Sequence, residues 1–284
     1  TDKKYGCSPE KRPIKQLIEY GIINLNKPSG PSSHLVSDYV QKILNINKSG
    51  HSGTLDPKVT GVLPIALSKA TRIVQTLLPS GKEYIATMKL HKPIEKKQIE
   101  KTFEKFTGEI QQLPPVRSAV KRRIRPRTVY YMEILEIKDD LILFKVGCEA
   151  GTYIRKLIHD MGKYMGKGAH MSQLVRTKAG PFNDKNWHSL QDLKDAFEIY
   201  KEKGNEKPLR KVIEPFENAI KFLPKVWILD SAVSNICHGA PLALQDISKL
   251  TDDIQQDSLI AVMTLKEELV CLGNSNMDSK KILK

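Results

Sequence analysis

The sequence has few cysteines and no long apolar run. Its 284 residues contain four cysteines, Cys7, Cys148, Cys237 and Cys271, and no two of them form a C-x-x-C pair. This spacing argues against a zinc site or a disulfide framework within the chain and favours isolated buried thiols. No apolar run reaches the roughly 18 residues of a membrane-spanning helix, and residues 1–4 lack the apolar core of a signal peptide. We therefore expect a cytoplasmic protein, or a nuclear one if the source is a eukaryote.

Acidic residues are also in deficit. The chain has 46 Lys and Arg against 32 Asp and Glu, a net charge of +14 with a pI of about 9.5. Such a balance fits a polyanionic partner, most simply a nucleic acid. An anionic membrane surface is the alternative, but no strongly amphipathic basic helix supports it. The length allows one large or two medium domains with real cores, and no repeat or low-complexity tract is present.

Hydrophobic periodicity predicts a mixture of helices and strands. We expect strands at residues 22–25, 84–90, 129–137 and 141–148. We expect helices that begin at Ser32 or Ser33 and at residues 151–152, and others over 65–78, 94–106 and 190–203. Residues 203–211 are charged and loop-like, which predicts a domain boundary. Short β segments at 227–229, 259–263 and 269–272, the last two joined as a hairpin, predict a small second domain.

One stretch, residues 50–64, surrounds a single carboxylate. Its sequence is GHSGTLDPKVTGVLP, with Asp56 at the middle. Three glycines and two prolines argue against a plain helix or a central strand and predict a shaped loop. An Asp-Pro pair alone is most often a turn, but the whole string is more specific. It resembles the catalytic motif of the TruB-type pseudouridine synthases, and the longer environment is similar to the branch with dyskerin and the archaeal H/ACA RNA-guided enzyme.

The resemblance implies a catalytic role for three residues. Pseudouridine formation needs a carboxylate, a cation to keep it ionised if it is buried, an aromatic face for the base and a group for the C5 proton. Asp56 then is the nucleophile. Arg155 lies in a string similar to the third family motif, whose Arg pairs with the catalytic Asp, and Tyr84 matches the Tyr that stacks on uracil and takes part in C5 proton transfer. Nothing is oxidised in this reaction, so we expect no cofactor and no metal.

Further residues match positions around that site. The resemblance places Tyr153 and Leu174 in the pocket wall and His51 near the RNA strand, although a lone His is more often structural. Lys27 and Pro28 belong to the first family motif, which supports the catalytic loop. That motif usually has an acid before Lys-Pro, whereas this chain has Asn26, which weakens any expectation of an ion pair for Lys27 within the turn.

A basic segment, residues 114–127, contains no acidic residue. Most such runs are solvated charged loops, but a run this dense repels itself unless an anion lies nearby, and we therefore expect contact with the RNA backbone. The cations expected to make this contact are Arg117, Lys121, Arg122, Arg123 and Arg125, and Arg127 belongs to the same run.

The resemblance also implies the architecture. It predicts an α+β fold: a pseudouridine-synthase catalytic domain at 21–210, whose mixed, mainly antiparallel sheet is flanked by helices, and a small β-rich PUA domain at 211–284. Strings such as residues 230–232, 238–240 and 261–264 are similar to the PUA domain. Residues 1–20 should form an N-terminal arm that packs on the PUA domain.

Three functions fit these observations. The first is a uridine isomerase in a particle with H/ACA guide RNA, in the nucleolus if the source is eukaryotic. There the family's enzyme acts on rRNA with three small accessory proteins, of glycine-arginine-rich, zinc-binding and kink-turn-binding ribosomal type. The second is a stand-alone tRNA pseudouridine-55 synthase acting on the T-arm. The third is a non-catalytic RNA-binding scaffold, but such a scaffold need not retain Asp56, Tyr84 and Arg155 together. A metal-dependent nuclease fits poorly, because no second acid lies near Asp56 in the sequence.

Overall fold

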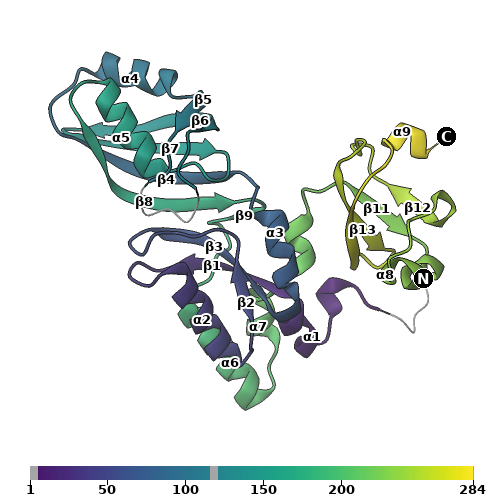
Figure 1. The fold of residues 1–284 in the computed structure, drawn as a ribbon. Helices are drawn as coiled ribbons and strands as arrows, with labels where there is room; N and C mark the ends of the chain where they lie inside the picture. The colour runs from purple at the N-terminus through teal and green to yellow at the C-terminus, as the bar shows by residue number, and fades with distance from the viewer. Residues whose placement is uncertain (1–5, 116–120, 284) are drawn as a thin grey trace.

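The computed structural model describes residues 6–115 and 121–283, which form two sheets with helices around them (Figure 1). The strands are β1 Gly21–Lys27, β2 Ser49–His51, β3 Thr60–Leu67, β4 Lys82–Leu90, β5 Gly108–Gln112, β6 Arg125–Lys138, β7 Leu141–Cys148, β8 Ala169–Ala179, β9 Phe182–Asn183, β10 Glu214–Pro215, β11 Lys225–Ile228, β12 Ile247–Leu250, β13 Leu259–Thr264 and β14 Leu269–Asn274. The α-helices are α1 Ile14–Glu19, α2 Ser33–Leu44, α3 Val74–Leu77, α4 Lys96–Lys105, α5 Ile154–Tyr164, α6 Leu190–Lys203, α7 Lys207–Val212, α8 Asp230–Cys237 and α9 Ser279–Ile282. Short 3-10 helices are η1 Pro9–Lys11, η2 Ser68–Ile73, η3 Phe216–Ile220 and η4 Leu244–Asp246.

The large sheet has two halves joined at one narrow place. Its strand order is β10-β1-β3-β8-β4-β7-β6-β5, with β2 on β3 and β9 on β8. The named strands pair antiparallel, except that β3 and β8 run parallel and meet only at Thr60–Val175 and Gly61–Arg176. Gly61 has φ +109°, and a Cβ there would lie 2.2 Å from the carbonyl oxygen of Arg176. Only glycine permits this approach of the two halves.

Helices cover each half of the sheet on one face (Figure 1). On the β4–β8 half, α4 and α5 bury a core that includes Met88, Phe144 and Leu157. On the β1–β3 half, α2 and α6 bury a second core that includes Leu25 and Val40. A mainly antiparallel sheet with flanking helices confirms the predicted α+β fold class.

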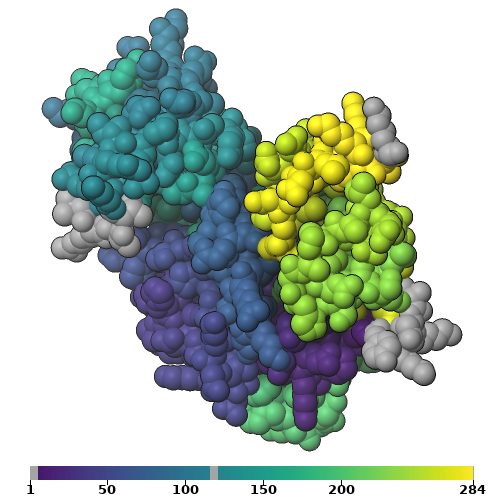
Figure 2. Space-filling view, turned by 45° about the vertical axis from the view of Figure 1, so that its right-hand side comes forward, coloured from purple at the N-terminus to yellow at the C-terminus, as the bar shows by residue number. Residues whose placement is uncertain are grey.

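The smaller sheet has the strand order β12-β11-β13-β14, and the C-terminal residues that form it lie beside the rest of the chain (Figure 2). β13 and β14 form the predicted antiparallel hairpin. Ala261 and Met263 of β13 share a buried cluster with Ile22 and Val62 of the large sheet. The two sheets are therefore joined by a common apolar contact rather than by a linker alone.

The N-terminal arm lies between both sheets. The Arg12 guanidinium donates to both carboxylate oxygens of Glu217, at 3.1 and 2.7 Å, and both side chains are buried. Glu217 also accepts from the backbone N–H of Leu269 on β14, and Lys266 Nζ donates to the carbonyl oxygen of Gly6. β10 pairs with β1, so the large sheet extends past the predicted boundary at residue 210. We therefore propose that the junction between the domains follows β10.

Three local predictions were wrong. Residues 65–67 do not begin a helix but end β3, because a strand buried on both faces reads as a continuous apolar run. Residues 60–64 also belong to β3, although they contain a proline. Pro64 is accommodated where β2 has ended at His51, and its carbonyl accepts from the Ser52 N–H. Residues 207–212 are not a loop but α7, which has Pro208 in its first turn and buries Leu209 and Val212.

The four cysteines are free, and Cys237 is exposed, against the expectation of buried thiols, whereas Cys148 is buried. None of the helices in the described part of the chain has the length and apolarity needed to cross a membrane.

Candidate active site

The loop that carries Asp56 is held from the turn after β1. Lys27 is fully buried, and its Nζ donates to the carbonyl oxygens of Pro28, Pro57 and Val59 at 2.9, 3.0 and 2.9 Å. Burial lowers the pKa of Lys27, and the negative charge of Asp56 opposes this shift. Where the sequence has Asn26 in place of an acid, Lys27 thus uses carbonyl oxygens as its partners. The bonds to Pro57 and Val59 fix the part of the loop that follows Asp56.

A second tether comes from α2. Ser32 caps this helix by accepting from the backbone N–H of Leu35. The next residue, Ser33, accepts from the N–H of Leu55 at 2.8 Å and donates to its carbonyl oxygen at 3.1 Å. The residue before Asp56 is therefore pinned to a helix whose other side packs in the core.

Asp56 forms an ion pair with Arg155 in the first turn of α5. The two side chains remain 54% and 61% exposed. The Asp56–Arg155 pair that the resemblance implies is therefore present, but it lies at the surface of the chain without RNA and not in a buried site. A pair this exposed contributes between about 0 and 1 kcal/mol to stability, so its effect here is to orient the carboxylate.

Tyr84 and Leu174 lie on the same sheet face, toward α5. Tyr84 of β4 is opposite Arg176 of β8, and Ala86 is opposite Leu174. Both Tyr84 and Leu174 are half-buried and pack on the core under α5. Burial raises the pKa of Tyr84, while the nearby charge and hydrogen bond of Arg176 act against the increase. The phenol therefore stays protonated at neutral pH.

Arg176 is a site residue that the sequence analysis missed. It is 1% exposed, its Nε donates to the carbonyl oxygen of Val62 at 2.7 Å, and its Nη2 donates to that of Gly53 at 3.1 Å. It thus connects β3, the Asp56 loop and Tyr84 at the junction of the two half-sheets. One signal could have indicated it, because Arg176 follows Leu174 by two residues on a strand and so shares its face.

The remaining predicted pocket residues flank this centre. Tyr153 is half-buried and is the N-cap residue of α5. His51 lies on β2 with its ring 4.9 Å from that of His34, and both its ring nitrogens are buried without a partner among the described residues. Burial lowers the pKa of His51, and His34 and Arg176 lower it further. His51 is therefore neutral at pH 7.

The basic segment divides into two parts. Arg117 lies outside the described residues, and Lys121, Arg122 and Arg123 are exposed. Arg125 is on β6 opposite Gln112 of β5. The segment has no acidic residue of its own, but the fold brings Glu149 to 3.2 Å from Arg127. Glu149 therefore supplies an anion to Arg127 within the chain, and RNA contact by the other cations stays a prediction.

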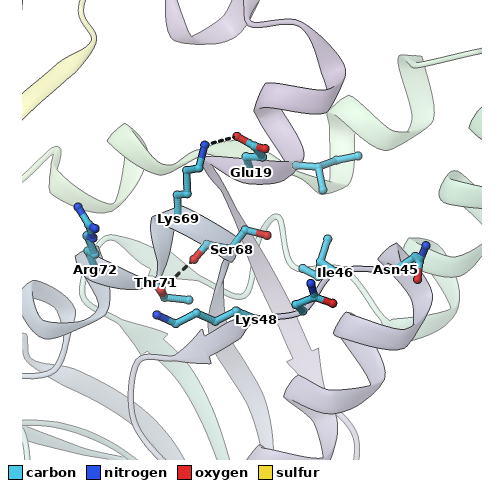
Figure 3. Close-up of a pocket in the computed structure, with 10 residues that line it drawn as sticks. Glu19, Asn45, Ile46, Lys48, Ser68, Lys69, Thr71 and Arg72 are labelled. Carbon is cyan, nitrogen blue, oxygen red and sulfur yellow. Dashed lines mark hydrogen bonds and ion pairs between the residues drawn. The ribbon is translucent and has the colours of Figure 1, made fainter.

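A pocket lies away from the predicted site residues. A pocket of about 470 Å³ between α1, η2 and the end of α2 is lined by Lys48, Thr71 and Arg72, and by Lys69, which pairs with Glu19 (Figure 3). None of the predicted site residues lines it. Within residues 6–115 and 121–283, no three His, Cys, Asp or Glu side chains are grouped to hold a metal ion.

Four family models match successive parts of the chain. Residues 41–154 match the TruB family pseudouridylate synthase N-terminal domain, and residues 155–221 match the tRNA pseudouridylate synthase B C-terminal domain. Residues 1–37 match the DKCLD (NUC011) domain and residues 224–284 the PUA domain.

Relatives of known name match over the whole chain. Proteins called "Probable tRNA pseudouridine synthase B" from Methanopyrus kandleri and Pyrococcus furiosus are 53% and 55% identical, and the match covers 100% of this chain and 84% of each relative. Two solved structures superpose with a TM-score of 0.94 over 100% of this chain and 87% of theirs. They are a Cbf5-Nop10-Gar1 complex, 55% identical, and an H/ACA RNP bound to a substrate RNA containing 2'-deoxyuridine, 52% identical. The chain therefore belongs to the TruB family and is an RNA pseudouridine synthase with a C-terminal PUA domain.

Proposed function

We propose that this chain is the catalytic subunit of an H/ACA particle, in which a guide RNA selects the uridines to be isomerised, with rRNA as the target. One observation carries the proposal. The chain is similar over its full length, including the PUA domain, to proteins solved in H/ACA complexes, at 52–55% identity. The partners would accordingly be a guide RNA and small proteins of the kinds named Nop10 and Gar1 in those complexes, and the site of action the cytoplasm.

In the proposed reaction, Asp56 adds to the target nucleotide as the nucleophile, and its bond to the nucleotide breaks again before the product leaves, which regenerates the carboxylate. The bond between ribose C1′ and uracil N1 breaks, the base turns, and a bond from C1′ to C5 forms. The proton from C5 is then lost and N1 gains one, so atoms and electrons balance without a redox partner. The loop held by Lys27 and Ser33 fixes the backbone around Asp56, and Arg155 aims its carboxylate.

Tyr84 would hold the base and relay its proton. Its ring offers a π-face to a base taken out of the stack. Because burial raises the pKa of Tyr84, a neutral hydroxyl and not a phenolate faces the base. A neutral hydroxyl is a weak base and takes up a proton only while it gives its own proton away, so Tyr84 would act as a relay and not as the final acceptor. Leu174 on the same face would close the apolar side of the pocket.

RNA contacts away from the site offset the cost of extracting the base, which is a few kcal/mol. The net charge of +14 supports this contact. We propose that Lys121, Arg122 and Arg123, exposed before β6, contact the RNA backbone. We also place His51 beside the strand around the target, as a neutral ring.

A second candidate is the stand-alone tRNA enzyme, which the printed name of the relatives supports. Pseudouridine mapping on two substrates separates the candidates: a tRNA transcript with this chain alone, and a short target RNA with an H/ACA guide and the accessory proteins. Each reaction is run beside Asp56→Ala and, as a matched control, Asp38→Ala on the exposed face of α2.

Product that depends on guide and accessory proteins, is lost in Asp56→Ala and persists in Asp38→Ala supports the guided enzyme. Efficient product on tRNA alone supports the second candidate instead. Asp56→Ala should bind RNA within about twofold of the parent, because Asp56 is exposed and holds no other element. Equal losses of affinity and turnover would contradict its assignment as the nucleophile.

A further inference from the structure

Gln112, the last residue of β5, is bonded to the residue that starts α5. It is 2% exposed. Its Nε2 donates to the carbonyl oxygen of Tyr153 at 3.2 Å, and its Oε1 accepts from the N–H of Tyr153 at 3.0 Å. The amide thus pairs with both backbone groups of one residue, as a neighbouring strand would. Arg155 follows Tyr153 by two residues, and no residue between them carries a tether of this kind.

The start of α5 needs such a support. Its N-cap, Tyr153, makes no side-chain capping bond, and the first turn contains no acidic residue. Instead the first turn carries two cations, Arg155 and Lys156, at the helix end where the dipole disfavours positive charge. Lys156 pairs with Asp160 within the helix, and the N–H of Leu157 donates to the carbonyl oxygen of Tyr153, but neither bond fixes the residues before the helix. The position of Arg155 therefore also depends on what holds Tyr153.

The strands β5 and β6 hold the rest of the loop before α5. Glu149 accepts from the backbone N–H of Thr128 at 3.0 Å and pairs with Arg127 on β6. Gln112 lies opposite Arg125 on the same pair of strands. Both ends of residues 149–153 are thus anchored to one strand pair, and at the end nearer Arg155 the anchor is the buried amide.

We propose that Gln112 is a positioning residue that holds the first turn of α5 so that Arg155 meets Asp56. The inference rests on the proposed roles of Asp56 and Arg155. Its action is indirect: Gln112 fixes Tyr153, Tyr153 fixes the start of the helix, and the start of the helix fixes the guanidinium. A displacement of about 1 Å in such a group can lower a rate by about a hundredfold.

Gln112→Glu tests the hydrogen-bond pattern directly. A protonated carboxyl donates and accepts as the amide does, whereas a carboxylate cannot donate to the Tyr153 carbonyl oxygen and is repelled by it. Burial raises the pKa of a carboxyl and the Arg125 guanidinium, opposite on β6, lowers it, so we expect the change between about pH 5 and pH 8. The single-turnover rate of the guided particle, relative to the parent, should fall by at least about tenfold over that range. Gln111→Glu, at the exposed neighbouring position, should follow the parent profile.

Circular dichroism and RNA affinity at both ends of the range show whether the Gln112→Glu particle is still folded and loaded. A merely structural role would change these two readouts together with the rate. A Gln112→Glu rate profile with the shape of the parent profile would overturn the proposal.

Gln112→Met keeps the length of the side chain and removes both bonds without adding charge. We expect its rate to fall by at least about tenfold, with RNA affinity within about twofold. In an Arg155→Ala background the same change should cost less than about twofold, because the two residues act in one chain of contacts. If the rate losses of Gln112→Met and Arg155→Ala multiply in the double variant, the two residues act independently and the proposal is refuted. Full activity of Arg155→Ala alone would instead refute the proposed role of Arg155, so the two failures are distinguishable.

Discussion

Lys82, two residues before Tyr84, should make the stability of this protein increase with pH above neutrality. The residue is buried, and its Nζ donates to the carbonyl oxygens of Leu77, Leu78 and Ser80 at 3.3, 2.7 and 2.6 Å. It thereby caps the C-terminal end of α3. Burial, followed by the charge of Arg176, lowers the pKa of Lys82 to about 8, from an ordinary value of 10.5.

The sign and size of this pH dependence follow from the linkage between protonation of Lys82 and folding. Between about pH 8 and 10.5 the unfolded chain binds the Lys82 proton and the folded chain does not, so the free energy of unfolding rises with pH. The stabilisation is complete above the unfolded pKa and is lost as the pH falls through the folded pKa. A shift of 10.5 to about 8 corresponds to ~3 kcal/mol. The three carbonyl oxygens favour the ammonium and make this an upper value.

Urea unfolding at a series of pH values measures the effect. Other groups titrate equally in parent and variant, so the difference in unfolding free energy between the parent and Lys82→Met isolates Lys82. From pH 7 to pH 10.5, the free energy of unfolding of the parent minus that of Lys82→Met should rise by up to ~3 kcal/mol. Lys82→Arg and Lys82→Met do not titrate in this range, so their mutual difference should stay flat. A flat difference between the parent and Lys82→Met would refute the reasoning and show that the carbonyl cage keeps the proton.

Three further predictions concern the Asp56 loop and its neighbours. Lys27→Met leaves the carbonyl oxygens of Pro28, Pro57 and Val59 without the ammonium as donor and should lower the urea-unfolding free energy by about 2–4 kcal/mol; an unchanged midpoint would show that water replaces the ammonium. Ser33→Ala removes the tether to Leu55 and should cost about 1 kcal/mol in the same assay, with a lower turnover on guided substrate; parental turnover would mean that Lys27 alone holds the loop. Tyr84→Phe keeps the ring and should lower turnover by about a hundredfold or more with RNA affinity within about twofold; parental turnover would remove the hydroxyl from the proton relay.

The sequence was informative about this site where the signal is local. The strings around Asp56, Tyr84 and Arg155 are short and specific, and the structure brings Asp56 and Arg155 together across 99 residues of separation. Lys27 was placed near the loop for the same reason. The nature of its bonds was not foreseeable, because its carbonyl partners carry no mark in the side-chain sequence.

For residues that act through strand register, the sequence indicates at most a shared strand face and not the contacts that the residue makes. In the sequence, Arg176 is one of several cations and carries no mark of a special role. Only the pairing of β3 with β8 at Gly61 buries it beneath the Asp56 loop. Gln112 reads as a neutral residue at the end of a short edge strand. Its partner Tyr153 is 41 positions away and is reached only after β5, β6 and β7 have paired in order.

The helix expected over 65–78 failed for a different reason. Leu67, Ala70, Val74 and Leu77 have helical spacing, and all four are buried. The same residues can be divided between the end of a doubly buried strand, a 3-10 turn and one turn of α-helix. Periodicity does not separate these outcomes in a segment this apolar. The pairing of β3 with β1 over Gly61–Ala66 decides it, and that pairing is a tertiary event.

The exposure of the Asp56–Arg155 pair has a consequence for how this enzyme depends on RNA. In the free chain both side chains face water, and the pair adds little to stability. A bound RNA strand would exclude that water, and the same two charges would then attract each other several times more strongly. The pairing therefore gains strength in the state in which the reaction occurs. It also follows that Asp56→Ala should fold as the parent does, so a loss of turnover in that variant reports on chemistry and not on the fold.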